Sequence, residues 1–186
     1  MTWHVVKLAD VAPTPWRNGG GVTRELAAWP PAGDWNWRMS VAEVAQSGPF
    51  SKFDGVERWF AVLAGAGVRL EVAGQAQTLG ATDPPFCFDG AAATDCQLID
   101  GSTQDLNLML QKSRASARML RLGQSYAGIV HAPKTIAIYA INTGASVLFN
   151  DEKLEIEPAS LAWRSVNETA QVRVIAAQSL WMEITP

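Results

Sequence analysis

The feature that most constrains this chain is a period-two alternation of apolar and polar residues, interrupted at short intervals by turn-forming residues. Residues 68–72 alternate strictly and residues 106–110 less strictly, while residues 136–139 form a short apolar run. Glycine, proline and aspartate separate these runs, as at residues 65–67. Short alternating segments of this kind are typical of strands joined by hairpins. We therefore predict an all-β fold with few helices, either a sandwich or a barrel.

A faint internal repeat indicates two similar β-halves. Residues 60–72 give a strand, a glycine turn and a second strand, and residues 136–149 repeat that plan. Two small β-halves in one chain would produce such an echo. Residues 111–122 are the best helical candidate, although an irregular crossover that runs into a strand fits them equally well.

Composition and charge exclude several classes of protein. With 186 residues and 48% hydrophobic residues, the chain can bury a core without a disulfide or metal. Its formal net charge of −3 lacks the basic excess of a nucleic-acid binder. The longest apolar run, residues 59–68, is too short for a membrane span, and no signal peptide is evident. We expect a cytoplasmic protein, and a disulfide between Cys87 and Cys96 is left open.

The densest polar cluster, residues 16–26, contains three consecutive glycines, Gly19 to Gly21. It lacks the lysine and the spacing of a phosphate-binding loop, so a bulged start of a strand is favoured. On that strand Thr23 and Glu25 share one face, and Asn18 stands just before it.

The next segment, residues 37–44, also alternates. Arg38 and Ser40 share one face of the expected strand, opposite a face that carries Trp37 and Met39. If the strand is covered on both sides, Arg38 and Ser40 point into the interior of a barrel. A solvent-facing pair remains the alternative.

Arg58 precedes the most apolar run of the chain and lies on an otherwise apolar strand face. An arginine in that position snorkels to the edge, pairs with an acid, or binds an anionic ligand. Asp54, Glu25 and Glu43 are the candidate acids. A guanidinium also matches a carboxylate with two parallel hydrogen bonds.

The last cluster places Asp105, Asn107 and Met109 on one strand face. Asp105 has an alternative role as a cap that bonds its own backbone at the start of the strand. The two histidines, His4 and His131, lie in no metal-ligand pattern, so no metal or cofactor is predicted.

Four segments together resemble the HutD/Ves family: residues 16–21 with Thr23 and Glu25, residues 37–42, residues 47–51 with Gly55 and Arg58, and residues 105–109. The resemblance implies a double cupin fold, in which two antiparallel β-barrels pack together in one chain. We expect an N-terminal cupin-like barrel with the ligand pocket at 1–110 and a C-terminal half at 111–186. Metal-dependent cupins place two histidines and a glutamate after a glycine. Residues 55–59 offer no histidine, which favours a barrel without a metal.

The same resemblance implies a protein of bacterial histidine utilisation that binds a pathway metabolite, usually suggested to be formylglutamate, and restrains the pathway. The pocket residues that it implies are Thr23, Glu25, Ser40 and Arg58, followed by Arg38, Asp105 and Asn107, to which we add Asn18.

We therefore expect a non-catalytic sensor of a small anionic carboxylate, with no nucleic acid or membrane as partner. Two alternatives stay open. One is a metal-independent cupin enzyme that acts on an amide or a sugar acid, with Glu25 as general base. The other is an interaction module, which an exposed strand at residues 135–141 would support, and a homodimer is also left open.

Overall fold

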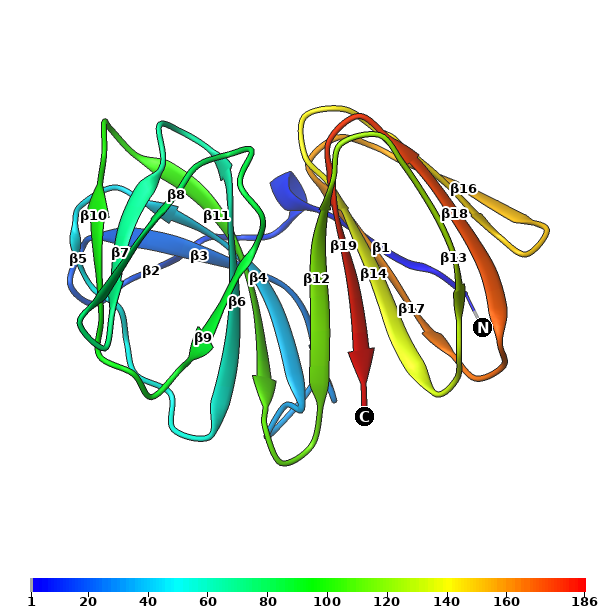
Figure 1. Ribbon diagram of the computed structural model, residues 1–186, viewed down its shortest axis with the longest axis horizontal. Coiled ribbons are helices and arrows are strands. Elements are labelled where there is room, and N and C mark those ends of the chain that lie inside the picture. The colour runs from blue at the N-terminus through cyan, green and yellow to red at the C-terminus, as the bar shows by residue number, and fades with distance from the viewer. Residues whose placement is uncertain (1) are drawn as a thin grey trace. The chain divides into compact units, whose positions relative to one another are not determined.

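The structure is a computed structural model that describes residues 2–186 and is built almost entirely of antiparallel β-strands (Figure 1). The all-β prediction is confirmed. The chain forms two compact units. The N-terminal unit is Ala12–Ala115, and the C-terminal unit combines the residues up to Val11 with Ser116–Pro186. A single boundary after residue 110 is predicted from the sequence. In the structure the N-terminal unit ends at Ala115, and the first strand belongs to the C-terminal unit.

The N-terminal unit contains a six-stranded sheet in the order β2-β3-β4-β11-β6-β9 and a four-stranded sheet in the order β5-β10-β7-β8. The strands are β2 (Thr14–Pro15), β3 (Gly21–Trp29), β4 (Trp37–Val44), β5 (Gly48–Pro49), β6 (Val56–Ala64), β7 (Val68–Val72), β8 (Gln75–Leu79), β9 (Phe86–Asp89), β10 (Thr94–Leu98) and β11 (Thr103–Gln111). The edge strands β2 and β5 each end in a proline, Pro15 and Pro49. Proline cannot donate to a strand ladder, so pairing stops there.

The C-terminal unit contains a five-stranded sheet in the order β1-β17-β14-β19-β12 and a four-stranded sheet in the order β13-β18-β15-β16. Its elements are β1 (His4–Lys7), the 3-10 turn η1 (Leu8–Asp10), β12 (Ser116–Leu122), β13 (Ser125–Val130), β14 (Lys134–Ala140), β15 (Ala145–Phe149), β16 (Glu152–Ile156), β17 (Ser160–Val166), β18 (Ala170–Ala176) and β19 (Ser179–Thr185). The ambiguous segment 111–122 is thus a turn that leads into β12.

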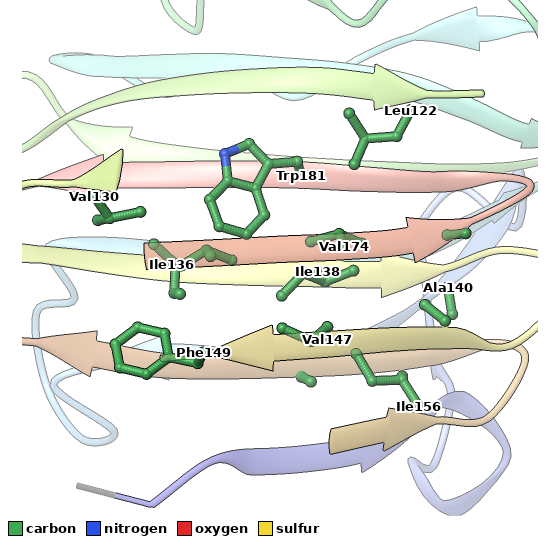
Figure 2. Packing of buried hydrophobic residues seen from close by; sticks show 14 of the residues in the cluster. Leu122, Val130, Ile136, Ile138, Ala140, Val147, Phe149, Ile156, Val174 and Trp181 are labelled. Carbon is green, nitrogen blue, oxygen red and sulfur yellow. The ribbon is translucent and has the colours of Figure 1, made fainter. Parts of the chain in front are cut away.

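In each unit the two sheets enclose a separate apolar core. The N-terminal core includes Phe60, Val62 and Leu70, all at most 1% exposed. In the C-terminal unit, Figure 2 shows Ile136, Ile138 and the other labelled side chains gathered between the strands. Both sheets of each unit are open rather than closed on themselves, so each half is a cupin-like pair of facing sheets and not a closed barrel.

The strand at residues 134–140, the two cysteines and the length of the helices bear on three predictions from the sequence. β14, which covers most of residues 135–141, is buried and pairs with β17 on one side and β19 on the other, so it offers no free edge. Cys87 and Cys96 are both free thiols, and burial raises the pKa of each to about 12. Between residues 2 and 186, no helix is long and apolar enough to cross a membrane.

Candidate functional site

A cavity of about 710 Å³ opens within the N-terminal unit. Its lining residues are Thr14, Pro15, Trp16, Arg17, Asn18, Thr23, Glu25, Arg38, Ser40, Ala42, Val44, Pro49, Phe50, Ser51, Phe53, Arg58, Phe60, Asn107 and Met109. Seven of the eight residues predicted from the sequence therefore line this one cavity, and Asp105 is the exception.

Strand register explains why the predicted polar residues meet. Ser40 on β4 pairs with Glu25 on β3 and with Asn107 on β11, which places these three side chains in one row. Side chains two residues apart on a strand share a face. Arg38 therefore lies on the same face, opposite Met109, and Met109 pairs in turn with Arg58 on β6.

Both faces of β4 are covered. Trp37, Met39 and Val41 on one face are at most 3% exposed, and Ser40 on the other is 4% exposed. The interior alternative is therefore correct for Arg38 and Ser40, since both line the cavity.

Arg58 is the main feature of the wall, with 7% of the residue exposed. Its Nη2 donates to Asn107 Oδ1 over 2.9 Å, and its Nη1 lies 3.5 Å from the Ser51 carbonyl oxygen. The buried Nε has no hydrogen-bond partner. No acid among the described residues forms an ion pair with Arg58, so the candidate acids Asp54, Glu25 and Glu43 are not its partners.

Three phenylalanine rings surround this guanidinium. Its Cζ lies 5.0 Å from the ring centroid of Phe50, 5.8 Å from that of Phe53 and 5.2 Å from that of Phe88. Burial, and after it the positive charge of Arg38, lower the pKa of Arg58 to about 10. Arg58 therefore stays cationic at neutral pH, held partly by cation–π attraction.

Arg38 and Glu25 form the second charged group. Arg38 Nε lies 2.7 Å from Glu25 Oε2, an ion-pair contact without the alignment of a hydrogen bond. Half of the Glu25 side chain is exposed, so the pair lies toward the solvent side of the cavity. With Arg17, Arg38 and Arg58 set against Glu25 alone, three positive charges face one negative charge and leave a net charge of +2 on the wall.

The glycine-rich segment forms the rim beside this pair. Asn18 Oδ1 accepts from the Gly20 backbone over 3.0 Å, and Trp16 Nε1 donates to Thr23 Oγ1 over 2.8 Å. β3 starts at Gly21, where a Cβ would lie 2.3 Å from the Glu43 carbonyl oxygen, so only glycine fits. The bulge predicted here lies further along, between Glu25 and Ala27.

Asp105 shares the inward face of β11 but lies deeper, between Ala42 and Val62. It is fully buried, its Oδ2 accepts from Thr103 Oγ1 over 2.8 Å, and its Oδ1 has no partner. Burial raises the pKa of Asp105 to about 7 against the opposing effect of the Thr103 hydrogen bond. Its alternative role as a backbone cap is not observed, because it lies within the strand and bonds a side chain.

Phe50, Phe53 and Arg17 line the cavity but were not among the residues singled out from the sequence. Arg17 stands inside the glycine-rich cluster. The pair Phe50 and Phe53 comes just before the lone inward arginine, and that proximity was the available signal.

The wall does not fit a metal ion. Glu25 is the one carboxylate among the residues that line the cavity, and this lining contains no histidine or cysteine. Residues 2–186 contain no group of three or more His, Cys, Asp or Glu side chains that could hold an ion. The side chains that bind metal in metal-dependent cupins are thus absent from the lining, and the excess of arginine on the wall suits an anion.

Comparison with known proteins gives consistent matches. The family model described as HutD matches residues 8–182. Protein Ves of Cronobacter sakazakii is 33% identical over 177 residues, which cover 91% of this chain and 92% of that protein. An uncharacterized 21.2 kDa protein in the hutC 3' region of Pseudomonas putida is 32% identical over 146 residues, covering 77% and 76% of the two chains.

Solved structures extend these matches to the fold. HutD from Pseudomonas fluorescens SBW25 superposes with a TM-score of 0.86 at 29% identity, over 99% of this chain and 98% of the other. A variant of Bacillus subtilis oxalate decarboxylase superposes with a TM-score of 0.64 at 8% identity, over 97% of this chain and 76% of that one. The latter likeness concerns the fold alone and supports its cupin-like character.

Proposed function

Because the chain belongs to the HutD family, which is related to histidine utilisation, we propose that it is a non-catalytic binding protein for a small carboxylate of that pathway. The single observation that carries the proposal is the burial of Arg58 without an acidic partner among the described residues. Arg58 is a buried cation on a cavity wall, and within residues 2–186 its hydrogen-bonding neighbours are limited to an amide and a backbone carbonyl. Burial of a charge without a counter-ion is costly, so a carboxylate that enters the cavity would relieve that cost.

The polar side chains around Arg58 suit a small dicarboxylate that also carries an amide or formyl group. The Arg58 guanidinium is the donor for the carboxylate, and the Ser40 hydroxyl lines the same cavity. Thr23 Oγ1 already accepts from Trp16, which leaves its O–H to donate. Asn107 Oδ1 is likewise engaged by Arg58, which leaves its NH₂ group to donate. N-formyl-glutamate carries the required groups, and the protein would respond to its level and restrain the pathway.

The cavity also suits the affinity that a metabolite gauge needs. Charge-assisted hydrogen bonds contribute about 1.5–3 kcal/mol each. Two or three of them, after the cost of association, correspond to micromolar to millimolar dissociation constants. The cavity volume of about 710 Å³ lies within the range common for small-molecule sites, which is about 300–1,000 Å³.

Calorimetric titration with N-formyl-L-glutamate tests the proposal. We expect saturable binding to the wild-type protein and a loss of about tenfold or more in Arg58→Met. The matched control is Arg69→Met, because Arg69 lies on β7 with half its side chain exposed and away from the cavity. Absence of binding to the wild type, or equal affinity in Arg58→Met, would refute the proposal.

The same samples separate binding from catalysis. The ligand is followed by NMR over hours at a large molar excess over the protein. An unchanged ligand spectrum is expected of a binding protein, whereas product in excess of the protein concentration would establish an enzyme.

A further inference from the structure

The two units repeat one strand plan, which allows positions in one to be matched with positions in the other through register alone. In the N-terminal unit β11 lies between β6 and β4, and in the C-terminal unit β19 lies between β14 and β12. β6 leads into the hairpin β7–β8, as β14 leads into the hairpin β15–β16. The correspondence is therefore of β6 with β14, β11 with β19, and β4 with β12.

Register then matches Asn107 with Glu183. Asn107 pairs with Phe60 on β6, and Glu183 pairs with Ile136 on β14. These two partners are the same residues at which the internal repeat of the sequence begins.

The neighbouring cations correspond as well. Arg58 lies two residues before Phe60, as Lys134 lies two residues before Ile136. Because side chains two apart share a strand face, each cation stands on the same face as the residue matched on the central strand.

In the C-terminal unit this arrangement carries its own counter-ion. Glu183 Oε2 lies 2.5 Å from Lys134 Nζ, and its Oε1 lies 2.5 Å from Arg118 Nη2. Trp181 Nε1 adds a hydrogen bond of 3.0 Å to the same carboxylate, of which 7% is exposed. Lys134, the cation matched with Arg58, thus has a counter-ion within the chain.

In the N-terminal unit an amide occupies the corresponding position. Asn107 has nearly the shape of an aspartate but carries no charge, so its 2.9 Å bond with Arg58 leaves the guanidinium without negative charge. Its NH₂ group donates, whereas a carboxylate there would only accept.

We infer that Asn107 is the residue that makes the cavity selective for an anion, because it stands uncharged where the C-terminal unit holds an internal carboxylate, and this inference rests on the function proposed above. The ligand's carboxylate supplies the charge that Glu183 supplies in the other unit. Its oxygens accept from Arg58 and from the Asn107 NH₂ group together. An aspartate at position 107 would satisfy Arg58 internally and repel that ligand.

The test compares two substitutions at one position, with N-formyl-L-glutamate as the titrant. Asn107→Asp changes almost only charge, and we expect it to weaken binding about 100-fold or more. Asn107→Ala removes the amide without adding charge, and we expect a loss of about tenfold or less. Asn142→Asp is the matched control, because it makes the same chemical change in an exposed turn, and its affinity should equal that of the wild type.

A second measurement needs no variant. The dimethyl ester of N-formyl-L-glutamate keeps the formyl amide but lacks both charges, and we expect no measurable binding of it to the wild type.

The outcomes separate the inference from the proposal beneath it. If the wild type binds the acid but Asn107→Asp binds it as well, or loses no more than Asn107→Ala, Asn107 does not set the charge preference and the proposed function stands. If the ester binds as tightly as the acid, the inference is overturned directly. If the wild type does not bind the acid at all, the proposed function itself fails.

Discussion

Thr103 Oγ1 donates a 2.8 Å hydrogen bond to Asp105 Oδ2, while the other oxygen of this fully buried carboxyl has no partner. The two residues lie on the same face of β11, and neither of them lines the cavity. A single neutral donor is a weak substitute for water around a carboxylate, and for that reason burial governs how Asp105 titrates.

Asp105 should make the folded state less stable as pH rises. Its folded pKa of about 7 exceeds the ordinary value of 3.8, so the unfolded state ionises first and stability falls between about pH 4 and pH 7. Asp105→Asn removes this dependence. We expect its free energy of unfolding, relative to the wild type, to rise by about 2–3 kcal/mol from pH 5 to pH 8. Urea denaturation at both pH values measures this difference. If the two proteins differ in free energy of unfolding by the same amount at pH 5 and pH 8, the prediction is wrong.

Glu183 should act in the opposite direction. Burial alone would raise its pKa, but hydrogen bonds from Lys134, Trp181 and Arg118 outweigh that effect and lower the pKa to about 2. The resulting stability is complete above about pH 4.5 and is lost as pH falls through about 2. We expect Glu183→Gln to lose about 2–3 kcal/mol at pH 7 and less in acid.

The control for Glu183 is Glu155→Gln. Glu155 pairs with Lys153, and about two thirds of each side chain is exposed. Exposed pairs contribute little, so this variant should lie within about 0.5 kcal/mol of the wild type by denaturation. If both variants lose the same free energy of unfolding, the buried Glu183 cluster stabilises the protein no more than an exposed ion pair does.

Arg58→Met should stabilise the ligand-free protein even though it weakens binding. The side chain fills similar space among Phe50, Phe53 and Phe88 and removes a buried charge that has no acid partner. Replacement of buried charge by apolar groups is often stabilising by about 1–4 kcal/mol. Differential scanning calorimetry without ligand should therefore give a Tm equal to or above that of the wild type. A fall of several degrees would mean that Arg58 is mainly structural.

Gly21→Ala should destabilise the N-terminal unit by about 2 kcal/mol or more, because its Cβ would lie 2.3 Å from a backbone oxygen on the paired strand. The strands β3 and β4 would have to separate there. Gly48→Ala serves as control, since a Cβ at Gly48 meets nothing within 4 Å. Thermal unfolding followed by circular dichroism distinguishes the two, and equal Tm values would contradict the close approach.

Period-two alternation predicted that Arg38 and Ser40 share one strand face and that Asp105 and Asn107 share another, whereas a common pocket for these residues was implied by the family resemblance. Alternation carries no information about depth along the strand. Asp105 shares the face of Asn107 but is fully buried two residues further along the strand, a difference that neither alternation nor the family resemblance indicates.

The remaining differences arise where the sequence is not periodic or where the contacts are distant. Phe50 and Phe53 reach the cavity mostly from loop positions, and no repeat marks them. An exposed edge at residues 135–141 would have supported the interaction-module alternative, but β14 is central because β17 and β19, both later in the chain, cover its two sides. Long-range pairing of this kind leaves no local signal.

The pairing of β1 with β17 has a consequence for biosynthesis. His4 lies opposite Trp163, so β1 is synthesised long before the strand with which it pairs. The continuous stretch Ala12–Ala115 holds every residue of the cavity and can fold while translation proceeds, since domains generally fold as units during synthesis. β1 can pair only after β17 has been synthesised, so it stays without its partner strand while the cavity-bearing unit folds.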